Sequence, residues 1–354
     1  MTTTVGVIGA GYISRFHFKA YAETKTPVAL VADVNRAAAE AAAAPFGAAV
    51  TEDWRKVIAH PTVNVVVVLT SSGSHFEMVR AALEAGKNVI SEKTLTLSAK
   101  QSLELGKLAE ASNLILYTSY MKRFFPAVQK TKELIPRLGH LMSVYARTYQ
   151  VVAPDNFHSG TLPGWVSREA DGASPIRKKS GGGVLVCGGS HILDLLLHLT
   201  GKPRGVFTRN FTREGSDVDL MSHALLDLEG GGTGHFEANW HPLRKIGYEK
   251  RGWDECLEIS GVNGRLVIQI PVWNEPENNA ATLTYYDNEA ETFTDYALPI
   301  VNPFVEAQRS FLENIAQGRQ GPQDRYTGYR VDLLLEKMQQ SADAGRPVEI
   351  RWDA

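Results

Sequence analysis

The stretch Val5–Ser14, VGVIGAGYIS, decides the fold of this chain. Its apolar run Val5–Ile8 predicts a buried strand, and the glycines after it predict a tight turn into a helix. Gly9 permits the turn, and Gly11 lets the backbone approach a pyrophosphate at the positive helix N-terminus. Ser14 holds the third small position of this pattern, where glycine or alanine is usual. The stretch therefore predicts a dinucleotide-binding strand–turn–helix unit.

Short apolar runs alternate with helical stretches through the first third of the chain. These runs are continuously hydrophobic, which is typical of parallel strands covered on both faces. They are Val5–Ile8, Val28–Ala32, Val63–Leu69, Asn88–Ile90 and Leu114–Thr118. Asn35 is a predicted helix N-cap, and so is Ser74, ahead of a helix at His75–Ala85. Strands and helices in this order predict a doubly wound parallel sheet with right-handed crossovers, which is an α/β fold.

From about Leu141 the strand-like stretches follow one another more directly. They are Leu141–Val151, Arg204–Arg213, Ser222–Leu228, Thr233–Trp240, Glu255–Ser260 and Arg265–Pro271. Asn263-Gly264 predicts a hairpin with a type I′ turn. Helices are expected at Ser190–Thr200, Pro303–Gln317 and Tyr326–Ala344. We expect a Rossmann domain over residues 1–124 and an α+β domain with an open, mainly antiparallel sheet over 125–354.

Composition excludes several classes of function. The 354 residues include 37 Lys and Arg against 39 Asp and Glu, a formal charge of −2, whereas nucleic-acid binders carry a basic excess. The apolar run Val65–Leu69 is too short to cross a bilayer, and no signal peptide is expected. Two cysteines, Cys187 and Cys256, cannot build a disulfide framework, which indicates a reducing compartment. We expect a cytoplasmic enzyme with no nucleic-acid or membrane partner.

Asp33 bears on the identity of the cofactor. It closes the second predicted strand, 24 residues after Gly9. A carboxylate there accepts hydrogen bonds from the adenosine ribose and repels a 2′-phosphate, which favours NAD over NADP. Arg36 provides the opposing interpretation, because an arginine can stack on adenine or bind that phosphate. The alternative for the whole pattern is a Rossmann domain that binds a flavin or a mononucleotide, or one that binds no nucleotide.

A series of motifs then occurs in a familiar order. They are GAGYISRFH (Gly9–His17), TSSGSH ending at His75, AGKNVISEK ending at Lys93, YMKRFFP ending at Pro126, and GGGVLVCGGSHILDLLLHLTG (Gly181–Gly201). In these motifs the chain resembles the Gfo/Idh/MocA family of oxidoreductases over nearly its full length. The resemblance implies a second domain whose open sheet makes homo-oligomer contacts. It also implies hydride transfer between a nicotinamide and a secondary alcohol of a sugar or cyclitol.

The same resemblance implies roles for single residues. The NAD site would be formed by Gly9, Gly11, Tyr12, Ile13, Asp33, Arg36, Ser71, Ser72, His75, Glu92, Lys93 and Arg123. Lys93 and His191 would be catalytic, with Asp194 one turn further along the helix of His191. The substrate would be contacted by Lys93, Arg123, Cys187 and His191, to which the residues of the preceding loop, considered without the resemblance, add Trp165 and Arg177. No metal ion is expected.

Two positions depart from the family pattern. Thr94 follows Lys93 where the family has proline, and Cys187 stands four residues before His191 where the family has aspartate. A thiol is a weak hydrogen-bond donor and acceptor, so either the proton relay differs or another carboxylate supplies the charge. This departure leaves open a redox-neutral glycosidase, which would use held NAD to oxidise the sugar, eliminate the aglycone and reduce the sugar again.

Four cationic residues, Arg168, Arg177, Lys178 and Lys179, precede the glycine run. One interpretation is a solvated surface loop, which is the usual role of a charge run. The other is an anion site for an acidic sugar such as a uronate or a sulfonated sugar, bound by arginine forks. Trp165 in the same stretch could present a flat face to a pyranose ring.

Overall fold

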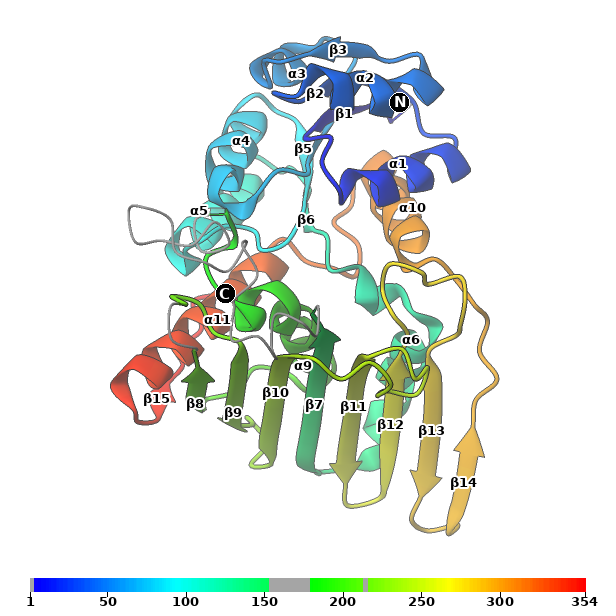
Figure 1. The fold of residues 1–354 in the computed structure, drawn as a ribbon, viewed down its shortest axis with the longest axis vertical. Coiled ribbons are helices and arrows are strands. Elements are labelled where there is room, and N and C mark those ends of the chain that lie inside the picture. The colour runs from blue at the N-terminus through cyan, green and yellow to red at the C-terminus, as the bar shows by residue number, and fades with distance from the viewer. Residues whose placement is uncertain (1–2, 153–178, 213–215) are drawn as a thin grey trace. The chain divides into compact units, whose positions relative to one another are not determined.

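The computed structural model describes residues 3–152, 179–212 and 216–354, which form two compact units (Figure 1). The first unit contains the chain up to Met121, then Pro303–Asp332, and Ala354. The second contains Lys122–Asn302 and Leu333–Asp353. The predicted division into 1–124 and 125–354 assigns 303–332 to the second domain, whereas these residues belong to the first unit.

A six-stranded parallel sheet forms the first unit, in the order β3-β2-β1-β4-β5-β6. Its strands are β1 (Val5–Ile8), β2 (Val28–Ala32), β3 (Ala49–Thr51), β4 (Val65–Val68), β5 (Asn88–Ser91) and β6 (Leu116–Thr118). This is the Rossmann order, in which the direction of winding reverses between β1 and β4. The predicted α/β fold is confirmed. The prediction missed β3, because three residues are too short for a periodic pattern.

The helices of this unit follow the strands in turn. They are α1 (Ser14–Glu23), α2 (Arg36–Ala43), α3 (Arg55–Ala59), α4 (Ser72–Glu84) and α5 (Ala99–Ala111). Asn35 caps α2 as predicted, since its Oδ1 accepts from Ala38 N at 3.2 Å. The prediction that Ser74 caps α4 is wrong. The helix begins at Ser72, and Ser74 Oγ donates to the Ser71 carbonyl at 2.9 Å within the first turn.

Helix α10 (Pro303–Ala316) and the start of α11 (Thr327–Ala344) return to the first unit. Phe304 stacks on Phe16 of α1, with 4.8 Å between the ring centroids. Close by, Tyr21 Oη donates to Gln308 Oε1 at 3.0 Å. These contacts join residues almost 300 positions apart, so no local pattern could have shown that α10 belongs with the Rossmann sheet.

A nine-stranded sheet forms the second unit, in the order β14-β13-β12-β11-β7-β10-β9-β8-β15. Its strands are β7 (Leu141–Val151), β8 (Gly205–Phe211), β9 (Met221–Asp227), β10 (Thr233–His241), β11 (Trp253–Gly261), β12 (Gly264–Ile270), β13 (Thr282–Asp287), β14 (Thr292–Asp295) and β15 (Val348–Glu349). Only β7 and β10 pair in parallel, so the predicted mainly antiparallel sheet is confirmed. The prediction missed β13 and β14; β14 is exposed along its whole length and has no alternation.

The hairpin between β11 and β12 differs in its turn from the prediction. Its two turn residues are Val262 and Asn263, and Gly264 already pairs with Gly261 as the first residue of β12. Neither turn residue has a positive φ, so this is not the predicted type I′ turn. The hairpin itself is present.

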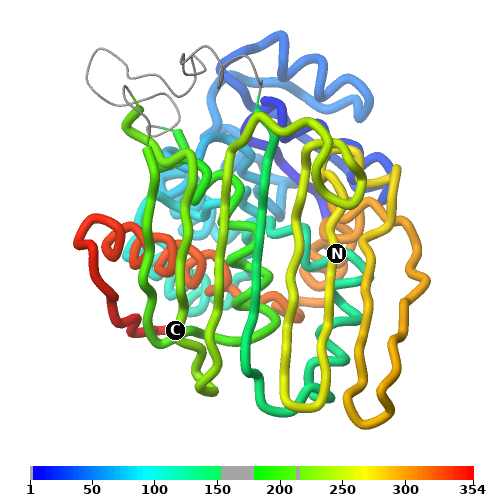
Figure 2. The backbone as a smooth tube through the Cα atoms, turned by 60° about the horizontal axis from the view of Figure 1, so that its bottom comes forward, coloured from blue at the N-terminus to red at the C-terminus, as the bar shows by residue number. Residues whose placement is uncertain are grey.

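One face of the nine-stranded sheet is covered by helices, and the other, here called the open face, carries no helix among the described residues. Helix α6 (Pro126–Leu134) packs on β12 and β13, and α9 (Ser190–Thr200) packs on β7. Figure 2 shows both helices behind the strands, and no described helix crosses the front of the sheet. A single π-helical turn, Leu185–Gly189, leads into α9, whose predicted bounds are confirmed.

Candidate functional site

Four strands of the first unit end at one edge of the sheet, and predicted site residues follow each end. Gly9 follows β1, Asp33 follows β2, Ser71 lies just past β4, and Glu92-Lys93 follows β5. Backbone hydrogen bonds continue past the strands here, as from Gly9 N to the Ala32 carbonyl at 2.8 Å. In doubly wound folds, the carboxyl edge at the reversal of winding is where ligands bind. The structure therefore brings the predicted residues between Gly9 and Lys93 to one edge.

Glycine is favoured at positions 9 and 11 of the first turn for two different physical reasons. Gly9 has φ +102°, and a Cβ there would lie 2.8 Å from the Leu69 carbonyl carbon, so the protein itself requires glycine. A Cβ on Gly11 would meet nothing within 4 Å. The open space at Gly11 fits the close approach of a dinucleotide backbone at the start of α1. Next to it, Tyr12 is 58% exposed and stacks beneath the Arg15 guanidinium, while Ile13 is half-buried at the helix start.

Asp33 is held beside the glycine turn by backbone amides. Its Oδ2 accepts from Ala10 N at 2.6 Å, and its Oδ1 accepts from Asn35 N at 2.7 Å. Arg36 is exposed and turned to acidic neighbours, with its Nε 2.8 Å from Glu40 Oε1 and a terminal nitrogen 4.0 Å from Glu52 Oε1. The carboxylate thus faces the turn, and the guanidinium is already engaged with two carboxylates.

A buried hydrogen bond connects Glu92 to α1. His17 Nε2 lies 2.9 Å from Glu92 Oε1, and the other carboxylate oxygen accepts from Lys93 N at 3.1 Å. Burial by itself raises the pKa of Glu92. The His17 hydrogen bond and the charges of His17 and Lys93 outweigh that effect, so the pKa is lowered and Glu92 is ionised at neutral pH. Glu92 is only 5% exposed and supports Lys93 from within the protein, and its predicted part in the cofactor site stays a prediction.

His75 lies beneath the same edge of the sheet. It is fully buried, with Nδ1 2.9 Å from the Thr94 carbonyl and Nε2 3.0 Å from the Thr70 carbonyl. Burial lowers the pKa of His75 although both carbonyls oppose this effect, so the ring is neutral and donates one N–H. His75 therefore joins the loop after β4 to the segment after β5, and its predicted part in the cofactor site stays a prediction.

Thr94, which departs from the family pattern, is also buried. Its Oγ1 donates to Ser72 Oγ at 3.2 Å, while Ser71 is exposed next to it. The peptide bond between Lys93 and Thr94 is cis. Lys93 itself is half-buried, and its two neighbours, Glu92 and Thr94, are buried and hydrogen-bonded to other parts of the first unit.

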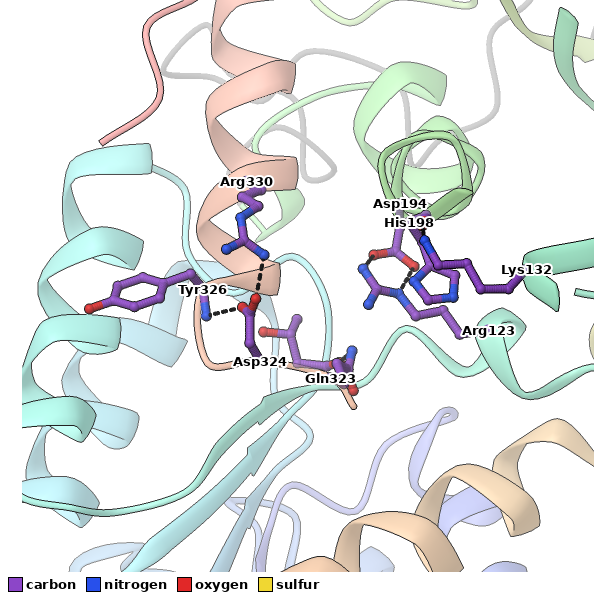
Figure 3. Close-up of polar contacts among 9 residues, drawn as sticks. Arg123, Lys132, Asp194, His198, Gln323, Asp324, Tyr326 and Arg330 are labelled. Carbon is purple, nitrogen blue, oxygen red and sulfur yellow. Dashed lines mark hydrogen bonds and ion pairs between the residues drawn. The ribbon is translucent and has the colours of Figure 1, made fainter. Parts of the chain in front are cut away.

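In the second unit, Arg123 forms a two-pronged ion pair with Asp194 (Figure 3). The two bonds are 2.8 and 2.6 Å long, and Asp194 is fully buried on α9. Burial raises the pKa of the Asp194 carboxyl, and the guanidinium charge works in the opposite direction. Two of the Arg123 donors are therefore directed to Asp194, and this pair fixes the start of the unit to the helix of His191.

His198 is in the same cluster, one turn beyond Asp194 (Figure 3). Burial and the charges of Arg123 and Lys132 lower the pKa of His198 to about 3, so its ring is neutral at physiological pH. Lys132 donates to the His198 carbonyl near the end of α9, where a cation is favoured by the helix dipole. His198 is therefore no acid catalyst near neutrality.

His191 and Cys187 lie at the start of α9 and in the π-helical turn before it, and both are half-buried. Cys187 Sγ lies 3.4 Å from Ser180 Oγ and 3.8 Å from the Gly182 carbonyl. Four glycines of this stretch, Gly182, Gly183, Gly188 and Gly189, pack against protein. A Cβ on Gly183 would lie 1.9 Å from the Asp219 carbonyl oxygen, so at this position the glycine serves the fold.

Part of the predicted substrate site falls outside the described residues. Trp165, Arg168, Arg177 and Lys178 belong to 153–178, and Lys179 is the first residue described after this stretch. Their predicted roles stay predictions.

Sequence reasoning missed a buried network that begins one residue before Arg123. Lys122 donates to Glu255, and Thr148 Oγ1 donates to the other oxygen of that carboxylate at 2.6 Å. Lys122 and Glu255 are each 1% exposed, which a charged residue tolerates only when it is paired. The motif YMKRFFP contained Lys122, but its partner on β11 is not visible in the sequence.

The described part of the chain contains no group of three or more His, Cys, Asp and Glu side chains arranged to hold a metal ion. In the same residues, no helix combines the length and apolarity needed to cross a membrane.

Comparison with known families agrees with this geometry. Residues 3–120 match the oxidoreductase family model for the NAD-binding Rossmann fold, and residues 128–267 match the GFO/IDH/MocA C-terminal domain. The chain belongs to the Gfo/Idh/MocA family of oxidoreductases.

Two curated members of this family are similar over most of the chain. One is a scyllo-inositol 2-dehydrogenase (NADP(+)) of Bacillus subtilis, 25% identical over 85% of this chain and 83% of its own. Another is a levoglucosan dehydrogenase of Pseudarthrobacter phenanthrenivorans, 25% identical over 96% of this chain and 95% of its own. A solved levoglucosan dehydrogenase in complex with NADH and levoglucosan superimposes with a TM-score of 0.83, at 22% identity over 99% of this chain and all of that one.

The ionised, buried Glu92 of this family member gives a pH-dependent stability. Because the folded pKa is below the unfolded value of about 4.3, the contribution is fully present above that pH and is lost as the pH falls through the folded pKa. We expect Glu92→Gln to lower the free energy of unfolding by about 1–3 kcal/mol near neutrality and by less in acid. Urea unfolding of wild type and Glu92→Gln at several pH values between 3 and 8 measures this difference in the free energy of unfolding.

Glu84→Gln is the control, because Glu84 pairs with Arg80 on the surface of α4. Its free energy of unfolding should follow wild type at every pH. A Glu92→Gln deficit that stays constant down to the most acidic sample would contradict an ionised Glu92.

Proposed function

We propose that this chain is an NAD-dependent dehydrogenase that acts on a secondary alcohol of a sugar, a sugar derivative or a cyclitol. The observation that carries the proposal is the carboxyl edge of the first sheet. There the glycine turn, Asp33 and Lys93 come together from three strands. Similar proteins suggest a substrate class, because they include dehydrogenases of an inositol and of levoglucosan.

The residues at this edge fit a nicotinamide dinucleotide. Open space at Gly11 admits a pyrophosphate to the N-terminus of α1, and Asp33 offers a carboxylate for the ribose hydroxyls. When bound, the nicotinamide supplies the acceptor for the hydride. The engagement of Arg36 with Glu40 and Glu52 supports NAD over NADP, since Arg36 would have to leave both to bind a 2′-phosphate.

Lys93 and His191 divide the remaining chemistry in this proposal. Oxidation of the alcohol breaks a C–H bond, whose hydride leaves to the cofactor, and an O–H bond, whose proton needs an acceptor. An imidazole ordinarily titrates in the physiological range, so His191 is the proposed proton acceptor. Lys93 would hold the hydroxyl and stabilise the developing alkoxide with its fixed charge.

The substrate proposed is acidic. Its support is the run of cationic residues Arg168, Arg177, Lys178 and Lys179 just before the π-helical turn that leads to His191.

The redox-neutral glycosidase is the second candidate, because a thiol at Cys187 replaces the family's aspartate. Net NADH release from a free sugar supports the dehydrogenase, whereas aglycone release without NADH supports the glycosidase.

The open face of the nine-stranded sheet is the surface proposed for a homo-oligomer. It bears exposed apolar side chains such as Phe211, Met221 and Leu225 on neighbouring strands. The proposed location is the cytoplasm, supported by two cysteines that form no disulfide.

NAD is expected to bind more tightly than NADP because of the Asp33 carboxylate. Two like charges about 4 Å apart repel by about 1 kcal/mol in water, which is roughly fivefold in affinity and more in a less polar site. Calorimetric titration of both cofactors measures the ratio. Asp33→Asn keeps an oxygen for Ala10 N and removes the charge, so it should narrow the ratio. If wild type binds NADP more tightly than NAD, and Arg36→Ala loses that preference, then NADP is the cofactor and Arg36 binds its 2′-phosphate.

Replacing the Lys93 amine should remove turnover while NAD still binds. We expect Lys93→Met to lower kcat by about 10²–10³-fold, the cost of removing one group that stabilises an oxyanion. Steady-state kinetics on the best substrate and an NADH titration check both parts. Lys100→Met, an exposed lysine at the start of α5, is the matched control and should behave as wild type. Near-normal kcat in Lys93→Met would remove Lys93 from the mechanism.

An arginine fork that binds a carboxylate or sulfonate contributes about 1.5–3 kcal/mol per charged hydrogen bond, which is roughly tenfold or more in preference. Wild type should therefore prefer a sugar with a C6 acid over its neutral counterpart, and Arg177→Ala should lose this preference. The ratio of kcat/KM for the two sugars is the measurement. A wild type indifferent to the acid, or a mutant that keeps the preference, would make Arg177 a surface residue.

A further inference from the structure

The segment that carries Lys93 is irregular and yet buried. Residues 92–98 connect β5 to α5 without helix or strand, while Thr94, Leu95 and Thr96 are each no more than 3% exposed. Buried backbone outside regular structure must find hydrogen-bond partners elsewhere. The positions of those partners decide how firmly Lys93 is held.

The first half of the segment is fixed by the contacts described above. Glu92 accepts from the Lys93 amide, and His75 contacts the Thr94 carbonyl at 2.9 Å. These contacts hold the Glu92–Lys93 and Thr94–Leu95 peptide units. They do not reach the second half, which has to be fixed from another direction.

Asp332 of α11 fixes the second half. Its Oδ2 accepts from Thr96 N at 3.1 Å and from Ser102 Oγ at 2.6 Å. Thr96 Oγ1 lies 2.8 Å from Ser102 Oγ, so the three residues form one connected group. Asp332 is 5% exposed and stands 236 residues after Thr96 in the chain.

Burial of the Asp332 carboxylate is unfavourable by itself, so its hydrogen bonds have to compensate for the lost hydration. Removing a carboxylate from water costs several kcal/mol unless hydrogen bonds compensate. Ser102 lies in the first turn of α5, where the helix dipole favours a negative charge. Asp332 is thus placed to hold both the end of the irregular segment and the start of the helix after it.

We propose that Asp332 is a positioning residue for Lys93, which acts by fixing Thr96 and thereby the segment 92–98. This inference rests on the proposed catalytic role of Lys93. It gives α11 a function in the reaction although no part of Asp332 contacts the reacting atoms. It also gives a reason for the return of residues 303–332 to the first unit.

The experiment compares two substitutions at Asp332 in the full chain. Asp332→Ala removes both hydrogen bonds, whereas Asp332→Asn keeps an oxygen acceptor of the same shape. A misplacement of about 1 Å at a reacting group costs about 10²-fold in rate. We therefore expect Asp332→Ala to lower kcat by roughly 10- to 100-fold with NADH affinity unchanged, and Asp332→Asn to recover most of kcat.

A second measurement reads the segment without reference to activity. Amide hydrogen exchange of residues 93–98 should accelerate in Asp332→Ala and be close to wild type in Asp332→Asn, while exchange of residues 5–33 stays unchanged. Asp324→Ala is the control. Asp324 stands near the start of the same helix and bonds Arg330 at 2.6 Å and Tyr326 N at 2.8 Å (Figure 3), and neither bond involves residues 92–98. It should leave both kcat and this exchange at wild-type values.

The outcomes separate this inference from the proposed function. Faster exchange with unchanged kcat, or lower kcat with unchanged exchange, would overturn the positioning role. If Asp332→Ala does not fold, Ser102→Ala removes one of the two bonds and should show the same changes at smaller size; wild-type kcat and exchange in Ser102→Ala would then overturn it. If Lys93→Met keeps its turnover, the proposed role of Lys93 fails instead, whatever the exchange shows.

Discussion

The hydrogen bond between His17 and Glu92 joins the two segments on which the site of this protein depends. His17 belongs to α1, the helix that begins at the glycine turn, and Glu92 immediately precedes Lys93. A bond between them sets the distance between the predicted cofactor turn and the predicted catalytic lysine. Because both partners are buried, the bond also keeps a carboxylate charged beneath Lys93.

The same design recurs around Lys93. Buried side chains, of which the sequence motifs contain some, hold the backbone of this region in place from below the surface. His75 bridges two loops, Ser72 binds the Thr94 hydroxyl, and Asp332 anchors Thr96. Parallel strands bring their carboxyl ends to one edge, but the loops that follow have no ladder of their own. Buried side-chain hydrogen bonds take over that task.

In the second unit, two buried ion pairs hold neighbouring segments in place. Arg123 binds Asp194 on α9, and Lys122 binds Glu255 on β11. Consecutive residues thus tie the beginning of the unit both to the helix that carries His191 and to the sheet. An arrangement that separated one partner from the other would leave an unpaired charge buried, which is strongly destabilising, so these pairs specify one arrangement of helix and sheet.

Much of this could be derived from the sequence. Continuous apolar runs and the glycine turn determined a parallel sheet and its ligand edge, because both depend on local pattern. Asn35 and the bounds of α9 were predictable for the same reason. The tertiary structure alone decided that α10 joins the Rossmann sheet, that His75 and Glu92 are buried supports, and that Asp332 meets Thr96. These are contacts across hundreds of residues or questions of burial, and neither leaves a local signal in the chain.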